Sequence, residues 1–161
     1  MAPRRAQQRR RVVPSPARAR VLSSRMAEDN VAFVRRCYEG LNRAYRTGQF
    51  LPVIQEGFDP DVVVKPSGLL PDSNEARGHD GVLRFIVAQW EAFEELQIEA
   101  EAYIAAGDRV VVPVRLGGRA RHTGLEVEFR FVHMLTIRDR KITRVDMYLD
   151  KQEALEAAGL E

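Results

Sequence analysis

The chain has 161 residues, 45% of them hydrophobic, and a formal net charge of +2, which suits one domain with a single core. It contains no run of about 20 apolar residues, which excludes a membrane-spanning helix, and its single Cys37 excludes an internal disulfide and a cysteine-based zinc site. One cysteine fits a reducing compartment, so we expect a cytoplasmic protein with no membrane partner.

Residues 1–26 form a basic arm without apolar periodicity. Residues 1–27 hold eight Arg and no acid, so the rest of the chain carries a net charge of −6. Such an arm buries too little apolar surface to offset its ordering entropy, which predicts disorder. Three interpretations of the arm are open. It could tether nucleic acid or anionic lipid, it could be a transit peptide, or it could be an extension upstream of a true start at Met26. We favour the third interpretation. Because the remainder is acidic, nucleic acid is not an expected partner.

Residues 27–161 are expected to form one domain that begins with a helix. Over residues 29–46, apolar side chains recur at spacings of three and four, which predicts an amphipathic helix. Asp29 or Asn30 is the expected N-cap, and Gly48 suits a left-handed end.

A second, shorter helix is expected over residues 52–57 and a strand over residues 61–65. Residues 66–79 are polar and predict a loop, after which Asp80 can cap a third helix. The apolar stripe of that helix consists of Val82, Phe85, Ile86, Trp90 and Phe93.

Four strands and a closing helix follow. Strict alternation of apolar and polar side chains predicts the strands, and short turns join them. Their ranges are 96–104, 109–116, 125–137 and 142–149, and the helix covers residues 151–158. Helices followed by a strand meander predict an α+β fold in which helices pack on one face of an antiparallel sheet.

Five short patterns carry a likeness to a known family. They are YEGLN (residues 38–42), FDPDV (58–62), RGHDGV (77–82), FVHML (131–135) and KI (141–142). Together with the element order they resemble the SnoaL-like branch of the nuclear transport factor 2-like superfamily, over roughly residues 28–158. The resemblance implies a curved antiparallel sheet wrapped around the N-terminal helices, forming a cone with a ligand-binding interior. That superfamily includes ketosteroid isomerases, polyketide cyclases, epoxide hydrolases and dehydratases, so fold alone does not choose a function.

His133 is the sharpest candidate site residue. Alternation places Phe129, Phe131 and His133 on one strand face that is otherwise apolar. The simplest interpretation is a hydrogen-bonded core histidine. The resemblance implies a pocket residue, because ketosteroid isomerases hold their oxyanion-stabilising acid at this position. Tyr38 resembles the second oxyanion donor of those enzymes, or is a core aromatic.

Other positions depart from the patterns of the relatives. Lys65 stands where a ketosteroid isomerase has its proton-shuttling Asp before Pro. Met147 stands where polyketide cyclases place an acid, and Asp146 turns inward only if the strand contains a bulge. Arg115 could supply the Arg of an epoxide hydrolase, but no acid lies beside it.

We therefore expect a pocket that binds a small apolar or polycyclic molecule, without metal or cofactor. An enzyme built on it would be a cofactor-independent isomerase, cyclase or dehydratase. The catalytic candidates are His133, Tyr38 and Asp146, and the ligand-contact candidates are Trp90, Phe93, Phe129, Phe131, Met147, Lys65 and Arg115.

The alternative is a non-catalytic dimeric scaffold or partner-binding domain. A homodimer is expected in either case, paired through the outer sheet face, and the residues expected there are Arg130, Val132, Met134 and Tyr148. A cavity of about 300 Å³ or more reached by His133 favours ligand binding, whereas a filled interior favours the scaffold.

Overall fold

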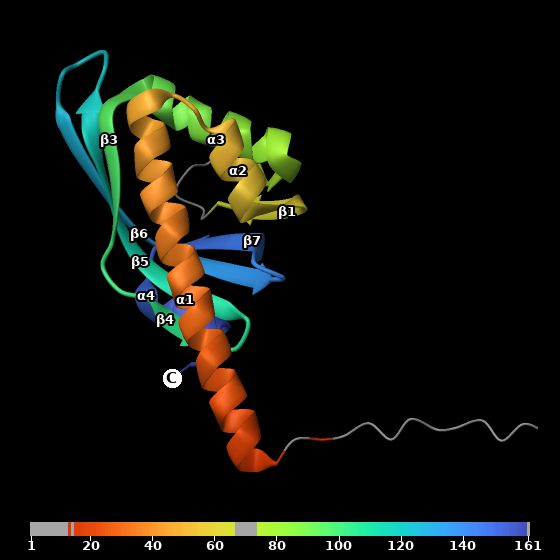
Figure 1. The fold of residues 1–161 in the computed structure, drawn as a ribbon. Coiled ribbons are helices and arrows are strands. Elements are labelled where there is room, and N and C mark those ends of the chain that lie inside the picture. The colour runs from red at the N-terminus through yellow and green to blue at the C-terminus, as the bar shows by residue number, and fades with distance from the viewer. Residues whose placement is uncertain (1–12, 14, 67–73, 161) are drawn as a thin grey trace, which may run out of the picture.

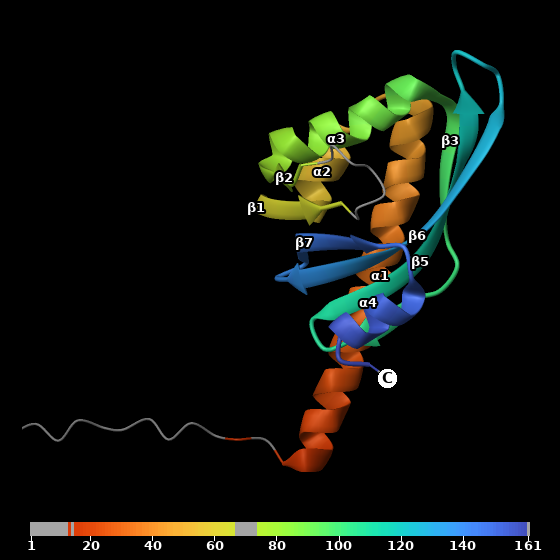
Figure 2. The same ribbon diagram turned by 180° about the vertical axis from the view of Figure 1, so that it is seen from behind.

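The computed structural model describes residues 13, 15–66 and 74–160 (Figures 1 and 2). The elements in chain order are α1 (Pro16–Thr47), α2 (Leu51–Gly57), β1 (Phe58–Lys65), β2 (Ala76–Arg77), α3 (Gly78–Ala92), β3 (Phe93–Ala100), β4 (Ile104–Ala106), β5 (Arg109–Ala120), β6 (Glu126–Arg138), β7 (Lys141–Tyr148) and α4 (Lys151–Ala157). The sheet is curved and α1 to α3 lie against its concave side (Figure 1), so the α+β expectation is confirmed. Within the described residues, no helix is both long and apolar enough to cross a bilayer.

One sheet contains every strand, in the order β2-β1-β7-β6-β5-β3, and β4 pairs with β5 beside this path. The meander from β5 through β6 to β7 is antiparallel, as the alternation and turns predict. The β1–β7 ladder is parallel, with Val64 opposite Val145. An entirely antiparallel sheet was expected, and no local pattern indicates this long-range pair.

A bulge in β3 contributes to the curvature of the sheet. The register against β5 shifts between Glu94 and Gln97, and Glu95 has a positive φ of 57°. A Cβ atom on Gly118 would lie 3.0 Å from the Leu96 side chain and 3.1 Å from the Glu94 carbonyl oxygen. Only glycine leaves this space, and a bulge increases the local bend and twist of a strand.

Helix α1 begins earlier than the sequence predicts. The Ser15 hydroxyl accepts a hydrogen bond from the Arg18 backbone N–H at 3.3 Å and caps the helix, so the expected cap at Asp29 or Asn30 is wrong. Residues 16–26 are helical, and the prediction of disorder is wrong for them, while residues 1–12 and 14 lie outside the described part. The physical reason is that a packed helix extends easily, since each added residue gains one hydrogen bond. Gly48, with a φ of 75°, ends α1 as expected.

The other boundaries shift by a few residues. Helix α3 begins at Gly78, two residues before the expected cap Asp80, and its N-cap Arg77 makes no side-chain cap bond. Part of the expected 66–79 loop forms β2, which pairs with β1, and residues 67–73 lie outside the described part. The strand expected over residues 96–104 ends at Ala100.

Two hydrophobic clusters lie on opposite faces of the sheet. The larger one fills the space between the concave face and helices α1 to α3. The smaller one joins Val111, Val132, Met134 and Ala154, so α4 covers this part of the outer face. Val132 and Met134 are only 4% and 5% exposed, and the expectation that they form an open dimer face is therefore wrong.

Candidate functional site

A cavity of about 370 Å³ lies between the concave sheet face and helices α1, α2 and α3. Each of these helices contributes apolar side chains, among them Leu41, Ile54 and Phe85. Among the described residues that line it, none carries a formal charge at neutral pH. The cavity therefore suits a neutral molecule, because a buried charge without a partner is strongly disfavoured.

Strands β6 and β7 form the sheet wall of the cavity. Phe129, Phe131, His133 and Leu135 project inward from β6, as alternation predicts, and Met147 projects from the neighbouring β7. Phe93 meets Phe129 edge to face, with ring centroids 5.7 Å apart. Phe129 is 43% exposed, which places these two rings where the cavity approaches solvent. Phe93, Phe129, Phe131 and Met147 thus lie where a ligand could touch them, and that role stays a prediction.

Tyr38 and His133 meet at the cavity. The Tyr38 hydroxyl lies 2.7 Å from Nδ1 of His133, a hydrogen bond between residues 95 positions apart. The helical stripe of α1 places Tyr38, and the alternation of β6 places His133. The Phe131 ring packs edge-on against the imidazole at 5.0 Å. Tyr38 and His133 therefore form one hydrogen-bonded pair in a lining that is mostly apolar.

Burial controls the charge of this pair. It lowers the pKa of His133 to about 4 and raises the pKa of Tyr38 well above its ordinary value, so both are neutral at pH 7. When the Tyr38 hydroxyl donates to Nδ1, the His133 proton sits on Nε2. When Nδ1–H donates instead, Nε2 is an acceptor and the hydroxyl proton is free. Among the described residues, Nδ1 of His133 has Tyr38 as its partner, whereas Nε2 has no hydrogen-bond partner. Nε2 can therefore bind a polar atom of a ligand.

Three further polar side chains line the cavity, and sequence reasoning did not propose them as site residues. They are Cys37, Tyr45 and Gln89. Burial raises the pKa of the Cys37 thiol to about 11 and that of Tyr45 above its ordinary range. Tyr45 follows Tyr38 by seven residues on the same helix stripe, which is a usable signal. Gln89, a single glutamine on α3, gives no such signal in the sequence.

Asp146 was a catalytic candidate only if a bulge turned it inward, and the structure leaves it outside the cavity lining. Its carboxylate pairs with Nε of Arg144 at 3.0 Å. The β6–β7 register does shift between Thr136 and Ile137, but Val145 and Met147 still line the cavity. Alternation then leaves Asp146 on the opposite face.

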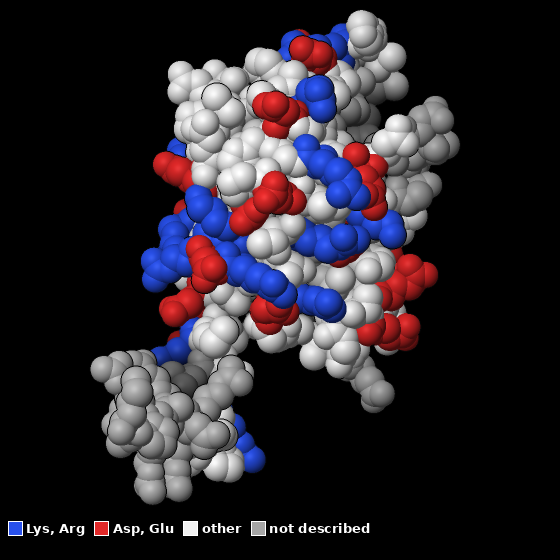
Figure 3. All heavy atoms as spheres, turned by 90° about the vertical axis from the view of Figure 1, so that its right-hand side faces the viewer, with Lys and Arg blue, Asp and Glu red and all other residues white. Residues whose placement is uncertain are grey.

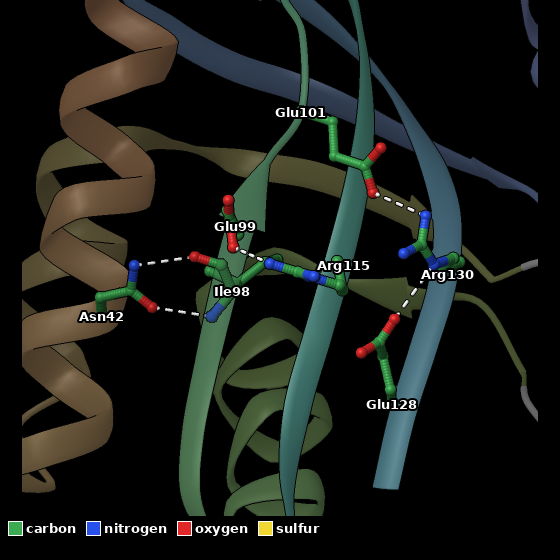
Figure 4. Close-up of polar contacts among 7 residues, drawn as sticks. All are labelled: Asn42, Ile98, Glu99, Glu101, Arg115, Glu128 and Arg130. Carbon is green, nitrogen blue, oxygen red and sulfur yellow. Dashed lines mark hydrogen bonds and ion pairs between the residues drawn. The ribbon is translucent and has the colours of Figure 1, made fainter.

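Three expected ligand contacts also lie outside the cavity lining. Lys65 is exposed, because its neighbour Val64 takes the inward position on β1. Arg115 pairs with Glu99 on the outer face of the sheet (Figure 4). Trp90 donates its indole N–H to the Tyr45 carbonyl oxygen at 3.0 Å. This hydrogen bond links α3 to α1 and uses the only polar group of the Trp90 side chain.

The outer face of the sheet is polar, in contrast to the cavity. Arg130 contacts Glu101 at 3.3 Å and Glu128 at 3.0 Å beside the Arg115–Glu99 pair (Figure 4). On the side of the molecule where β1 and β7 lie, basic and acidic side chains are also interspersed, with a band of basic ones across the middle (Figure 3). Exposed pairs of this kind contribute little to stability, but they keep the surface hydrated.

Comparison with known proteins gives one matching family. The sequence model of the SnoaL-like domain matches residues 34–145. No curated protein matches the chain.

Similar solved structures share the fold. A protein from a species of Jannaschia, described as a SnoaL-like polyketide cyclase, is 19% identical with a TM-score of 0.66, over 93% of this chain and 99% of that one. A nuclear transport factor 2-like protein of unknown function from Burkholderia pseudomallei is 25% identical with a TM-score of 0.62, over 79% of this chain and 95% of that one. TerC, co-crystallised with polyporic acid, is 23% identical with a TM-score of 0.62, over 81% of this chain and 98% of that one.

Proposed function

Because the chain belongs to the SnoaL-like domain family, we propose that it binds a small, neutral, largely apolar molecule in the cavity of about 370 Å³. The observation that carries this proposal is the Tyr38–His133 pair, buried in a lining that is mostly apolar. Small-molecule sites typically combine apolar walls with a few placed polar groups, and have volumes of about 300–1,000 Å³.

The lining favours an aromatic or polycyclic ligand. Phe93, Phe129 and Phe131 offer ring faces and edges, and Met147 offers a polarisable surface beside them. Nε2 of His133 or the Tyr38 hydroxyl would bond to one hydroxyl or carbonyl oxygen of the ligand. The structural neighbour TerC was co-crystallised with polyporic acid, which supports a small organic molecule as the ligand.

Two probes that differ by one hydroxyl group test the proposal. Wild-type protein should bind 2-naphthol more tightly than naphthalene, by about five- to tenfold, because a buried hydrogen bond contributes about 1 kcal/mol. The double substitution Tyr38→Phe with His133→Phe should remove this preference and leave the affinity for naphthalene almost unchanged. Fluorescence titration measures both affinities, and Arg84→Ala on the exposed side of α3 is the control. The same preference in wild type and the double variant would contradict the proposal, as would a failure of either probe to bind.

The second candidate is cofactor-free acid–base chemistry next to a carbonyl group, such as isomerisation, cyclisation or dehydration. With the proton on Nδ1, the Tyr38 hydroxyl can donate to a carbonyl oxygen while Nε2 accepts a proton from the adjacent carbon. The burial that lowers the pKa of His133 to about 4 also makes it a weak base, so ligand binding remains the leading proposal.

Deuterium exchange separates these two candidates. In D₂O, an acid–base site should speed exchange of the protons next to the carbonyl of 1-tetralone, as followed by NMR. His133→Phe and Tyr38→Phe should each abolish the acceleration. If 1-tetralone binds but its deuterium exchange is not accelerated, the acid–base candidate fails and ligand binding alone remains.

A homodimer also remains a proposal, through the uncovered part of the outer sheet face, where Arg130 is exposed. A scaffold with no ligand is less favoured, because its interior would be filled by side chains. Light scattering on the purified protein measures the oligomeric state, and a monomer would contradict the dimer.

A further inference from the structure

Helix α3 contributes one polar side chain to the cavity. Among the described residues of α3 that line it, only Gln89 is polar. Gln89 follows Phe85 and Ile86 by four and three residues and precedes Phe93 by four, so it lies on the same inward stripe as these apolar side chains. The cavity therefore has a second polar group besides the Tyr38–His133 pair, and the distance between the two bears on the shape of a ligand.

The helical wall places Gln89 far from Tyr38. Trp90, the next residue after Gln89, is hydrogen-bonded to the Tyr45 carbonyl oxygen at 3.0 Å, and the C-terminal ends of α1 and α3 lie together (Figure 1). Tyr45 follows Tyr38 by seven residues, which is about 10 Å along a helix that rises about 1.5 Å per residue. Gln89 is thus held about two helical turns from Tyr38.

The sheet wall gives the same result from the other side of the cavity. Phe93, one turn after Gln89, contacts the Phe129 ring with a centroid distance of 5.7 Å. Phe129 and His133 are four residues apart on β6, which is about 13 Å along a strand. Gln89 therefore lies at the solvent end of the cavity, and the Tyr38–His133 pair lies deeper.

Both polar groups are open to the cavity. Among the described residues, no buried side-chain nitrogen or oxygen atom lacks a hydrogen-bond partner. No described group is bonded to the Gln89 amide or to Nε2 of His133, so these atoms remain accessible at the cavity that both side chains line. The half-buried Gln89 amide gives up hydration that no described residue replaces, and a polar atom of a ligand can replace it.

We propose that Gln89 binds the ligand, and that the ligand is an elongated, neutral aromatic molecule with a hydroxyl or carbonyl oxygen at each end. This inference rests on the function proposed above and adds the class of ligand. The inner oxygen bonds to the Tyr38–His133 pair and the outer oxygen to the Gln89 amide, which can donate or accept. The rings between them lie against Phe131 and Met147.

Three rod-shaped probes test the inference: biphenyl, 4-phenylphenol and 4,4′-biphenol. Wild-type protein should bind 4-phenylphenol more tightly than biphenyl, and 4,4′-biphenol more tightly than 4-phenylphenol, by about five- to tenfold at each step. Gln89→Leu should remove the second gain and keep the first, as measured by fluorescence titration. The matched control is Gln97→Leu, the same change at an exposed position of β3 between buried Leu96 and Ile98, and it should keep both gains.

The outcomes separate this inference from the proposed function. If 4-phenylphenol binds more tightly than biphenyl but the second hydroxyl adds nothing in wild type, the ligand site stands and the two-ended ligand is wrong. If the second gain persists in Gln89→Leu, Gln89 is not the outer contact and the inference fails, and its loss in Tyr45→Phe would assign that contact to the Tyr45 hydroxyl. If no probe binds, the proposed function fails as well.

Discussion

At the scale of single residues, burial decides the chemistry of His133. The imidazole is 9% exposed, hydrogen-bonded to one neutral hydroxyl, and flanked by aromatic rings. No charged side chain among the described lining residues is available to stabilise an imidazolium, so its pKa falls to about 4. Protonation of His133 is therefore linked to unfolding.

The first prediction is a loss of stability in mild acid. The unfolded chain takes up a proton near the ordinary pKa of 6.5, while the folded protein resists protonation until about pH 4. The free energy of unfolding should therefore fall as pH drops through this window, by about 2 kcal/mol between pH 7.5 and pH 5 from this group. Urea unfolding of wild type and His133→Phe at both pH values measures it. The difference between the two proteins should change by that amount, and parallel behaviour would contradict the prediction.

The sequence predicts single residues well where one periodicity decides the outcome. Strand alternation placed Phe129, Phe131 and His133 inward, and the same rule placed Asp146 outward unless a bulge intervened. It could not predict that Tyr38 meets His133, because no local pattern encodes contact between a helix and a strand 95 residues later. Trp90 was predicted to contact a ligand, but it packs against the core instead. An apolar stripe on a helix indicates burial and does not tell whether a side chain faces the core or a cavity.

At the scale of elements, α1 is held to the edge of the sheet by one amide side chain. Strand β3 pairs with β5 along one edge only. On its other edge, Asn42 Nδ2 donates to the Ile98 carbonyl oxygen at 2.8 Å, and Asn42 Oδ1 accepts from the Ile98 N–H at 2.9 Å (Figure 4). The side chain thus takes the place of a neighbouring strand and fixes α1 one turn from Tyr38.

The second prediction concerns this contact. Asn42→Ala should lower the free energy of unfolding by about 2 kcal/mol, because two part-buried backbone groups lose their partners. Exposed Arg43 offers the adjacent control, and Arg43→Ala should change stability by less than about 0.5 kcal/mol. Denaturant titration of both variants measures the effect. Equal losses would mean that the amide contributes no more than a surface residue.

Element boundaries were predictable where a local signal ends a helix, and less so elsewhere. Gly48 ended α1 as expected because its backbone adopts the left-handed conformation. The start of α1 at Pro16 was missed, since residues 16–26 lack the apolar stripe that reports packing. The parallel β1–β7 ladder was missed for another reason, because pairing of distant strands depends on the whole fold.

At the scale of the whole molecule, α4 divides the outer sheet face into a covered and an open part. It packs Ala154 and Leu155 over Val111, Val132 and Met134. The rest of that face presents ion pairs such as Arg115–Glu99. Removing the cover would expose a contiguous apolar patch, and such patches promote association.

The third prediction follows from that cover. Ala154 is fully buried, so Ala154→Asp places a carboxylate against the cluster and should displace α4. Light scattering should then show a larger mean mass than for wild type, and a hydrophobic dye should bind more strongly. Exposed Glu156 supplies the control, and Glu156→Ala should behave as wild type. An unchanged mass and dye signal would mean that α4 is not needed to cover the face.

The parallel pairing of β1 with β7 also bears on how the protein is made. Val64 and its partner Val145 are 81 residues apart. At roughly 5–20 residues per second, a ribosome needs about 4–16 s to synthesise the intervening chain. Nascent chains stalled at residue 135 should be cleaved by protease within residues 58–65, whereas released full-length chains should resist. Until translation is nearly complete, this valine-rich segment has no long partner strand, and chaperones have that interval in which to bind it.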